Sequence, residues 1–272
     1  MKNFFLLIFL IISLDSLCQT NSIAEAYLDS GLTKTMVNEY SGSIIFYNKA
    51  IEHDPKNIIA FFERAKAKYE LRDYLGAMKD YKRLSEINPK DQDAYIGIGD
   101  SKFQLNDFNG AYISYSKAIE LNPSYSIAYR KRGAVNGILK KYKESITDFN
   151  KAIFLNPDYA EAYFGRGVSK QFLEDHRGAI LDFLKSIEII PEYADAYYDI
   201  GFSYHSLKNY EEAALNYTKA IELNYKYKSK AYLNRGNAKF YSNDLDGACL
   251  DWSNAGELGE DEAYEQIKLK CK

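Results

Sequence analysis

The chain is poor in the side chains that carry most catalysis and metal binding. Its 272 residues include only three histidines and three cysteines, and no histidine has a metal-ligand partner three or four positions later. The motifs CxxC, HExxH, GxSxG and GxxxxGK[S/T] are absent from the sequence. We therefore expect no enzymatic activity, no metal site and no bound cofactor.

An excess of charge of one sign is also lacking. The chain has 35 basic and 38 acidic residues, interspersed, for a formal net charge of −3. A nucleic-acid-binding protein needs a basic patch or stripe, so we do not expect nucleic acid as a partner.

The apolar run near the N-terminus is too short to span a membrane, which takes about 20 residues. Residues 4–14 form this run, preceded by Lys2 and followed by the polar residues 15–18. The pattern is typical of a secretory signal peptide over residues 1–18, cleaved before Gln19. The alternative is a lipid anchor through Cys18, for which the preceding Asp-Ser-Leu is a poor signal. The sequence thus predicts an exported, periplasmic or extracellular protein without an integral membrane span.

Proline is scarce, and its distribution reveals the organisation of the chain. The five prolines lie 34 residues apart, at Pro55, Pro89, Pro123, Pro157 and Pro191. One aromatic ladder steps by 34 through Tyr27, Phe61, Tyr95, Tyr129, Tyr163, Tyr197 and finally, after 35, Tyr232. A second runs through Tyr47, Tyr81, Tyr115, Phe149, Phe183, Tyr217 and Trp252, again with a last step of 35. This period indicates one supersecondary unit copied in tandem, with one residue inserted near 225–230.

Residues 160–193 show what one copy is. Its second half places apolar residues at the i, i+3, i+4, i+7 spacing of an amphipathic helix, at Ala179, Ile180, Phe183, Leu184 and Ile187. A short polar turn precedes this helix, and Pro191 ends the copy because the residue before a proline avoids the α region. Each copy is therefore predicted to form helix A, a tight turn, helix B, and a turn into the next copy.

Small residues recur inside both helices. Helix A carries a glycine in six copies, at Gly31, Gly99, Gly133, Gly167, Gly201 and Gly236, and twelve residues later helix B carries serine or alanine. Glycine inside a helix costs about 1 kcal/mol relative to alanine, so its recurrence needs a packing reason. We expect small residues to face each other, which lets the two helices approach closely.

The chain resembles the tetratricopeptide repeat (TPR) family. Tyr163, Gly167, Ala179, Phe183 and Pro191 fall at the spacing of that repeat's aromatic, Gly, Ala, aromatic and Pro positions. The resemblance covers residues 24–260 in seven copies that start near residues 24, 58, 92, 126, 160, 194 and 229. One departure is that Arg or Ile replaces the usual Leu just before the helix A glycine. The ending of the last copy resembles the closing repeat of exported Bacteroidetes proteins of this kind.

The resemblance implies an all-α fold, a right-handed superhelical solenoid of helix-turn-helix repeats. Residues 261–272 are predicted to form a C-terminal capping helix, because Ala263, Ile267 and Cys271 make an apolar stripe that can cover the last repeat. Cys249 lies on the helix that this cap should contact. A Cys249–Cys271 disulfide is therefore possible in an oxidising compartment, and two separate buried thiols are the alternative.

In this family, helix A residues line a concave groove. The register predicts a peptide-binding groove formed by Leu28, Phe62, Tyr69, Ile96, Asp100, Phe103, Arg130, Lys131, Phe164, Tyr198, Asp199, Phe202, Leu233, Asn234 and Asn237. Core packing between repeats is the alternative for the aromatic members of this set. The resemblance implies a monomeric, non-enzymatic scaffold that binds a protein or peptide segment, with an oligomer as the alternative. The alternative function is a structural subunit of a cell-envelope assembly that uses the convex face or the ends.

Overall fold

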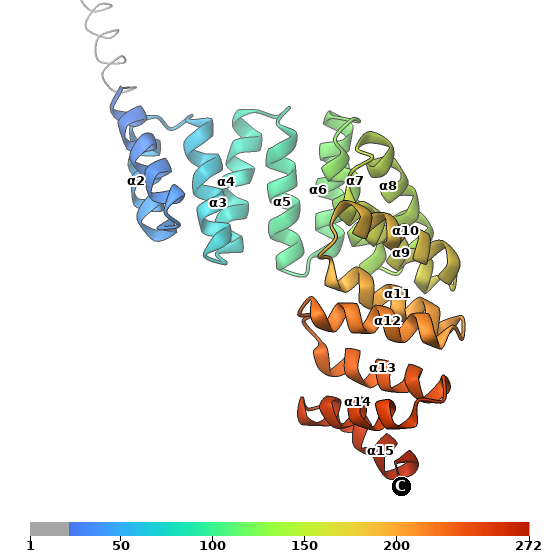
Figure 1. Ribbon diagram of the computed structural model, residues 1–272. Coiled ribbons are helices and arrows are strands. Elements are labelled where there is room, and N and C mark those ends of the chain that lie inside the picture. The colour runs from blue at the N-terminus through green and yellow to red at the C-terminus, as the bar shows by residue number, and fades with distance from the viewer. Residues whose placement is uncertain (1–21, 272) are drawn as a thin grey trace, which may run out of the picture. The chain divides into compact units, whose positions relative to one another are not determined.

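The computed structural model describes residues 22–271, and all regular secondary structure in that range is helical (Figure 1). Residues 22–36 form the first A helix and pair with α2 (Tyr40–His53). The following A and B helices are α3 (Ile58–Glu70) and α4 (Tyr74–Ile87), α5 (Gln92–Gln104) and α6 (Phe108–Leu121), α7 (Ser126–Ile138) and α8 (Tyr142–Leu155), α9 (Ala160–Phe172) and α10 (His176–Ile189), α11 (Ala194–Ser206) and α12 (Tyr210–Glu222), and α13 (Lys228–Tyr241) and α14 (Leu245–Glu257). A last helix, α15 (Asp261–Lys270), follows. The predicted fold class, helix-turn-helix repeats closed by a C-terminal helix, is confirmed, while the predicted signal peptide lies outside the described residues.

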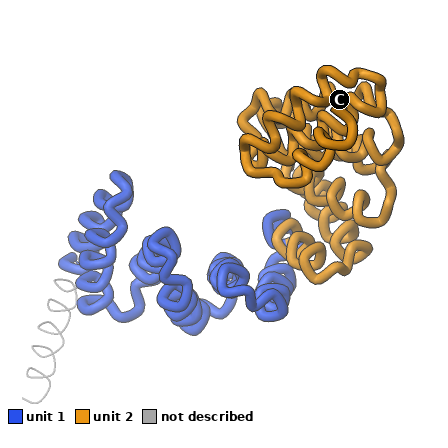
Figure 2. Tube along the Cα trace, turned by 90° about the horizontal axis from the view of Figure 1, so that it is seen from below, with its two compact units in different colours: residues 1–128 blue, residues 129–272 orange. Residues whose placement is uncertain are grey.

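The chain divides into two compact units at residue 128, within α7 (Figure 2). In residues 22–128 (unit 1) and again in residues 129–271 (unit 2), the helices follow one another side by side, and each contacts chiefly its neighbours in the chain. Stability in such an array comes from each repeat stacking on the next. None of the described helices is both long and apolar enough to cross a membrane.

Two local features fix the turn between helix A and helix B: a residue with positive φ and a capping aspartate. The residue two places before each B helix has a positive φ of 58–67°: Asn38, Arg72, Asn106, Lys140, Glu174, Lys208 and Asn243. In four copies the next residue is an aspartate that caps the B helix. For example, Asp175 accepts a hydrogen bond of 2.9 Å from the N–H of Gly178. A side chain at Gly178 would collide with this carboxylate, with its Cβ 2.1 Å from Oδ2, which explains the glycine three residues into the helix.

Position numbers below count from the first residue of each copy. The rings at position 24, which form the second aromatic ladder, are buried in every copy, from 0% to 6% exposed. In the six copies that have a helix A glycine, the ring lies against it, so that a Cβ on Gly167 would be 2.6 Å from the Phe183 ring. The prediction that small residues face each other was therefore incomplete, because the glycine mainly makes room for a ring.

The arginine that departs from the family pattern has a partner in helix B. In copy 5, Arg166 at position 7 donates from Nε and Nη2 to both carboxylate oxygens of Asp182, at 2.9 and 2.6 Å. Lys170 adds a contact of 2.8 Å, and the guanidinium lies 5.4 Å from the centre of the Tyr163 ring. The equivalent pairs are Arg64–Asp80, Arg132–Asp148 and Arg235–Asp251. Copies 3 and 6 lack both partners. The two positions hold Ile98 and Ser114 in copy 3, and Ile200 and Asn216 in copy 6.

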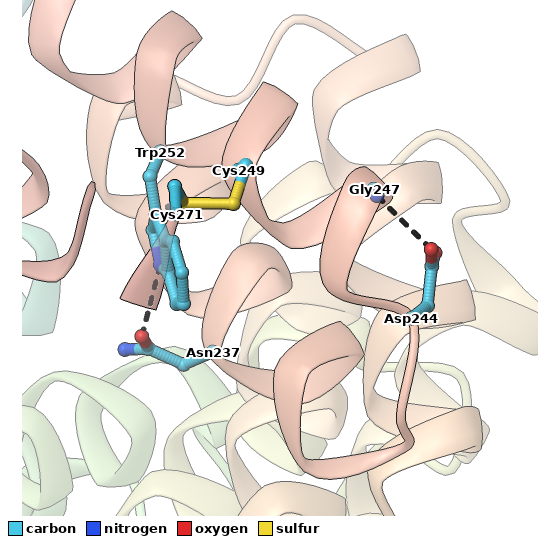
Figure 3. Close-up of a disulfide and its surroundings, with 6 residues drawn as sticks. All are labelled: Asn237, Asp244, Gly247, Cys249, Trp252 and Cys271. Carbon is cyan, nitrogen blue, oxygen red and sulfur yellow. Dashed lines mark hydrogen bonds between the residues drawn. A yellow bond between two sulfur atoms is a disulfide. The ribbon is translucent and has the colours of Figure 1, made fainter. Parts of the chain in front are cut away.

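The helix α15 covers the last repeat. Its Ala263 is fully buried, and Ile267 and Cys271 pack with it against the cluster that contains Trp252. Cys271 forms a disulfide with Cys249 on α14, with the two Cα atoms 5.9 Å apart (Figure 3). The ammonium of Lys270 lies 4.1 Å from the centre of the Phe240 ring. The apolar stripe of this helix thus provides the capping surface.

Candidate functional site

A hollow with a largely apolar lining lies in unit 2, where copies 4 and 5 meet. It has a volume of about 610 Å³ and is lined by α7, the start of α8, α9 and Tyr193. We call it the Gly137 pocket, because Gly137 lines it near the end of α7. Pockets of 300–1,000 Å³ with mostly apolar linings and a few polar groups are the usual ligand sites of proteins.

The pocket exists because copy 4 lacks a side chain at position 12. The residues at this position are Thr35, Tyr69, Phe103, Gly137, Gln171, His205 and Phe240. In copies 2 and 3 the ring at position 12 meets the aromatic residue that begins helix B, at 5.1 Å for Tyr69–Tyr74 and 5.5 Å for Phe103–Phe108. Gly137 leaves this space unfilled in copy 4.

Aromatic rings form the walls of the pocket. Tyr142, which begins α8, stacks on Phe172 with the centroids 4.8 Å apart and the planes within 4°. Phe172 is 62% exposed, so this stacked pair is open to solvent on one side. Across the pocket, Phe164 packs against Tyr193 at 4.8 Å. The lining therefore offers broad apolar surfaces that remain accessible.

The small residues of the lining have specific contacts. Gly165 lies against the Phe149 ring, and a Cβ there would be 2.3 Å from it. A Cβ on Gly137, by contrast, would meet only Ser145 Oγ, at 3.6 Å. Ser145 donates to the Gly133 carbonyl and shares a hydrogen bond of 2.9 Å with Ser169. These buried hydroxyls are satisfied by the protein, so the accessible polar character comes from charged residues.

The charged groups of the lining are Arg130, Lys140 and Glu161. Arg130 Nε donates to the Tyr159 hydroxyl at 2.7 Å, and its guanidinium lies 5.7 Å from the centre of that ring. Burial raises the pKa of Tyr193 to about 12, with Asp195 as the next cause, and burial likewise raises the pKa of Tyr159. Both phenols therefore stay neutral at physiological pH, and the lining carries two cations against one anion.

The structure contradicts three of the predicted groove residues. Leu28, Ile96 and Leu233 are buried, with 8%, 8% and 5% of their surface exposed, and Leu28 and Leu233 belong to core clusters. All three occupy position 5, where the longer side chains Arg130 and Phe164 reach the surface of the pocket. Short aliphatic side chains at this position remain in the core.

Four further groove candidates in unit 1 are half-buried: Phe62, Tyr69, Asp100 and Phe103. Two of them already have polar partners. Asp100 accepts a hydrogen bond of 2.7 Å from the Tyr115 hydroxyl, and the Tyr69 hydroxyl accepts one of 3.0 Å from Gln104. These residues lie on successive A helices, α3 and α5, and are partly available to a ligand.

In unit 2, the candidates outside the pocket form a second group: Lys131, Tyr198, Asp199, Phe202, Asn234 and Asn237. Tyr198 stacks on Tyr225 at 4.5 Å and accepts a hydrogen bond of 2.8 Å from Asn234. Asn237 accepts from the indole N–H of Trp252 (Figure 3). Burial, and secondarily Asp195, raises the pKa of Asp199 to about 7. Phe202 is 42% exposed and is the most accessible apolar member of this group.

Within residues 22–271, no group of three or more His, Cys, Asp and Glu side chains is placed to hold a metal ion. His205 packs edge-on against Tyr210 at 5.2 Å, and burial lowers its pKa. His205 is therefore part of an aromatic cluster with Tyr210 and Tyr241.

Comparisons with known proteins agree with the fold and the repeat. Residues 194–224 match the family model Tetratricopeptide repeat, and residues 99–137 and 138–171 match the model TPR repeat. These three segments therefore match tetratricopeptide repeats. No match was found among curated protein sequences.

Several solved structures are similar. MamA is 28% identical, with a TM-score of 0.55 over 60% of this chain and 95% of that one. YrrB, a TPR protein with an unusual peptide-binding site, is 24% identical with a TM-score of 0.54 over 65% of this chain and 91% of that one. A tetratricopeptide repeat protein from Parabacteroides merdae is 16% identical, with a TM-score of 0.67 over 92% of this chain and all of that one. These structures share the helical repeat fold of this chain.

Proposed function

We propose that this chain is a non-enzymatic TPR scaffold that binds a protein or peptide segment in the groove formed by its A helices. The Gly137 pocket carries the proposal, because it is an accessible apolar hollow on the helix A side of copies 4 and 5. YrrB, which shares the fold, is a TPR protein with a peptide-binding site. Apolar grooves between helices accept extended or helical segments through a few anchoring side chains.

A second function has its own support. In unit 2, the B helices α10, α12 and α14 each expose a leucine at position 22: Leu181, Leu215 and Leu250, at 62–68%. We call these three residues the helix B face. Exposed apolar patches can mark interaction sites, so this face favours the alternative of a structural subunit in a cell-envelope assembly.

Substitutions on the two faces separate the functions. We would capture partners from an envelope extract with the unaltered chain, with Phe172→Ala/Phe202→Ala, and with Leu181→Ala/Leu215→Ala, and quantify them by mass spectrometry. All four residues are exposed, so both double variants should fold. Groove binding predicts partners that are lost with the phenylalanine variant and kept with the leucine variant. The reverse pattern would support the assembly function.

We also propose that the protein is exported, as in the Bacteroidetes type that its last copy resembles. The signal-like pattern of residues 1–18 supports this, and so does the disulfide, because such bonds persist in oxidising compartments. Mass spectrometry of the mature chain should find Gln19 as the first residue. A chain that begins with lipid-modified Cys18 would support the anchored alternative, and a retained residue 1 would contradict export.

A further inference from the structure

We propose that the Gly137 pocket takes an aromatic side chain of the partner segment, and that acidic residues flank this side chain. The inference rests on the proposed function and specifies the chemistry of the segment. It follows from the side chain that copy 4 lacks and from the charges around the hollow.

The repeat itself shows which side chain fits this place. In copies 2 and 3 an aromatic ring at position 12 packs edge-on against the ring that begins helix B. Copy 4 keeps that second ring as Tyr142, which stacks on Phe172 of copy 5, while Gly137 supplies no ring from its own copy. An aromatic side chain from another molecule can occupy the position that Tyr69 and Phe103 fill in their own copies. Edge-to-face contacts of this kind add to the energy of apolar burial.

The charges around the pocket determine which residues should flank the aromatic side chain in the partner segment. Aromatic walls alone would also suit a cation. Arg130 and Lys140, however, outnumber Glu161 in the lining, and like charges disfavour a lysine or arginine anchor. In the described part of the chain, the hydrogen bond of Arg130 is made by Nε alone, so its terminal nitrogens can bind a carboxylate. Asp or Glu beside the aromatic anchor fits this arrangement.

The test selects peptides from a random phage-displayed library on the full chain and measures the affinity of the enriched peptide by fluorescence polarisation. We expect enriched sequences with Phe, Tyr or Trp next to Asp or Glu. Gly137→Phe fills the pocket in the way Phe103 fills its own copy, and should weaken binding about tenfold or more. Gly42→Phe on α2 is the matched control, because it makes the same substitution outside the pocket, where an added Cβ would meet no atom closer than 3.7 Å, and it should bind within about twofold of the unaltered chain.

The outcomes separate this inference from the proposed function. Peptides that lose affinity with Phe172→Ala/Phe202→Ala but are indifferent to Gly137→Phe would overturn the pocket inference and leave groove binding intact. Enrichment of basic or purely aliphatic anchors would likewise overturn the pocket inference. No enrichment, or binding that ignores both groove variants, would overturn both proposals. Circular dichroism checks that Gly137→Phe folds, and Ala134→Phe, which enters the pocket from position 9 of the same helix, serves as a second filling variant.

Discussion

At the scale of single residues, glycines of this chain serve different purposes. Gly165 and Gly167 make room for the buried rings of Phe149 and Phe183. Gly137 faces open space apart from Ser145 Oγ, so it creates a hollow and no packing contact requires it. A glycine that weakens its helix without improving the packing is consistent with a functional role, as the proposed pocket requires.

Gly137→Ala should therefore stabilise the protein, whereas Gly165→Ala should destabilise it. Alanine in place of glycine contributes about 1 kcal/mol in a helix interior. Residue 137 is the penultimate residue of α7, so the gain should be smaller there, but no collision opposes it. At residue 165 the new Cβ would collide with the Phe149 ring. Urea denaturation of both variants measures the difference. A destabilised Gly137→Ala variant would show that the space at residue 137 is not free.

Asp199 makes stability depend on pH. Its folded-state pKa is raised from 3.8 to about 7, mainly by burial and then by Asp195, so the folded chain holds a proton that the unfolded chain releases. The free energy of unfolding should fall as pH rises from about 4 to about 7. Asp199→Asn removes this dependence and should raise Tm at pH 8, by roughly 2–4 °C for each kcal/mol that the buried charge costs. At pH 4 the two proteins should melt together, and an equal gain at both pH values would contradict the assignment.

At the scale of elements, a buried ion pair joins the A and B helices in four of the seven copies. Arg166→Leu would leave Asp182, whose side chain is 5% exposed, without its bidentate partner. The free energy of unfolding should fall by roughly 3–5 kcal/mol. A value towards the lower end is expected because Lys170 still contacts Asp182. Chemical denaturation measures it. Arg166→Ile with Asp182→Asn installs the pair found in copy 6, and should recover about half of the loss or more. No recovery would mean that the Ile–Asn pair depends on other residues of copy 6.

The helix pattern was predictable from the sequence because every copy repeats the same constraints. The A helices α3, α5, α9 and α11 begin at residues 58, 92, 160 and 194, the starts given by the period of 34. The ion pairs could also have been inferred, since arginine at position 7 always accompanies aspartate at position 23. The burial of Leu28, Ile96 and Leu233 was not predicted. The repeat register shows which way a residue faces, but not whether its side chain is long enough to reach the surface.

The Gly137 pocket was not predicted for a similar reason. The groove was expected where large side chains lie, and Arg130 and Phe164 do line the pocket. The hollow itself, however, arises where a side chain is missing. Gly137 is the one glycine at position 12 among the seven copies, and this signal was available in the sequence.

At the scale of the whole molecule, α15 and its disulfide close the last repeat. The Cys249–Cys271 bond spans 22 residues, and a loop of about that length contributes roughly 3 kcal/mol in the chain-entropy model. Cys271→Ser should lower the stability of copy 7 by up to that amount and alter the fluorescence of Trp252, the single tryptophan of the chain. Effects should be confined to the neighbouring repeats. Thiol titration of the denatured, unreduced mature protein should find no free thiol, and two per chain would contradict the bond.

Site-specific photocrosslinking in cells tests the central claim, binding on the helix A side, most directly. A photoreactive phenylalanine analogue replaces either Phe202 on the helix A side or Leu181 on the helix B face, both of which are exposed. The account predicts that a discrete partner is crosslinked from residue 202, that Gly137→Phe greatly reduces this product, and that the control Gly42→Phe leaves it unchanged. A partner crosslinked from residue 181 and not from residue 202 would contradict it.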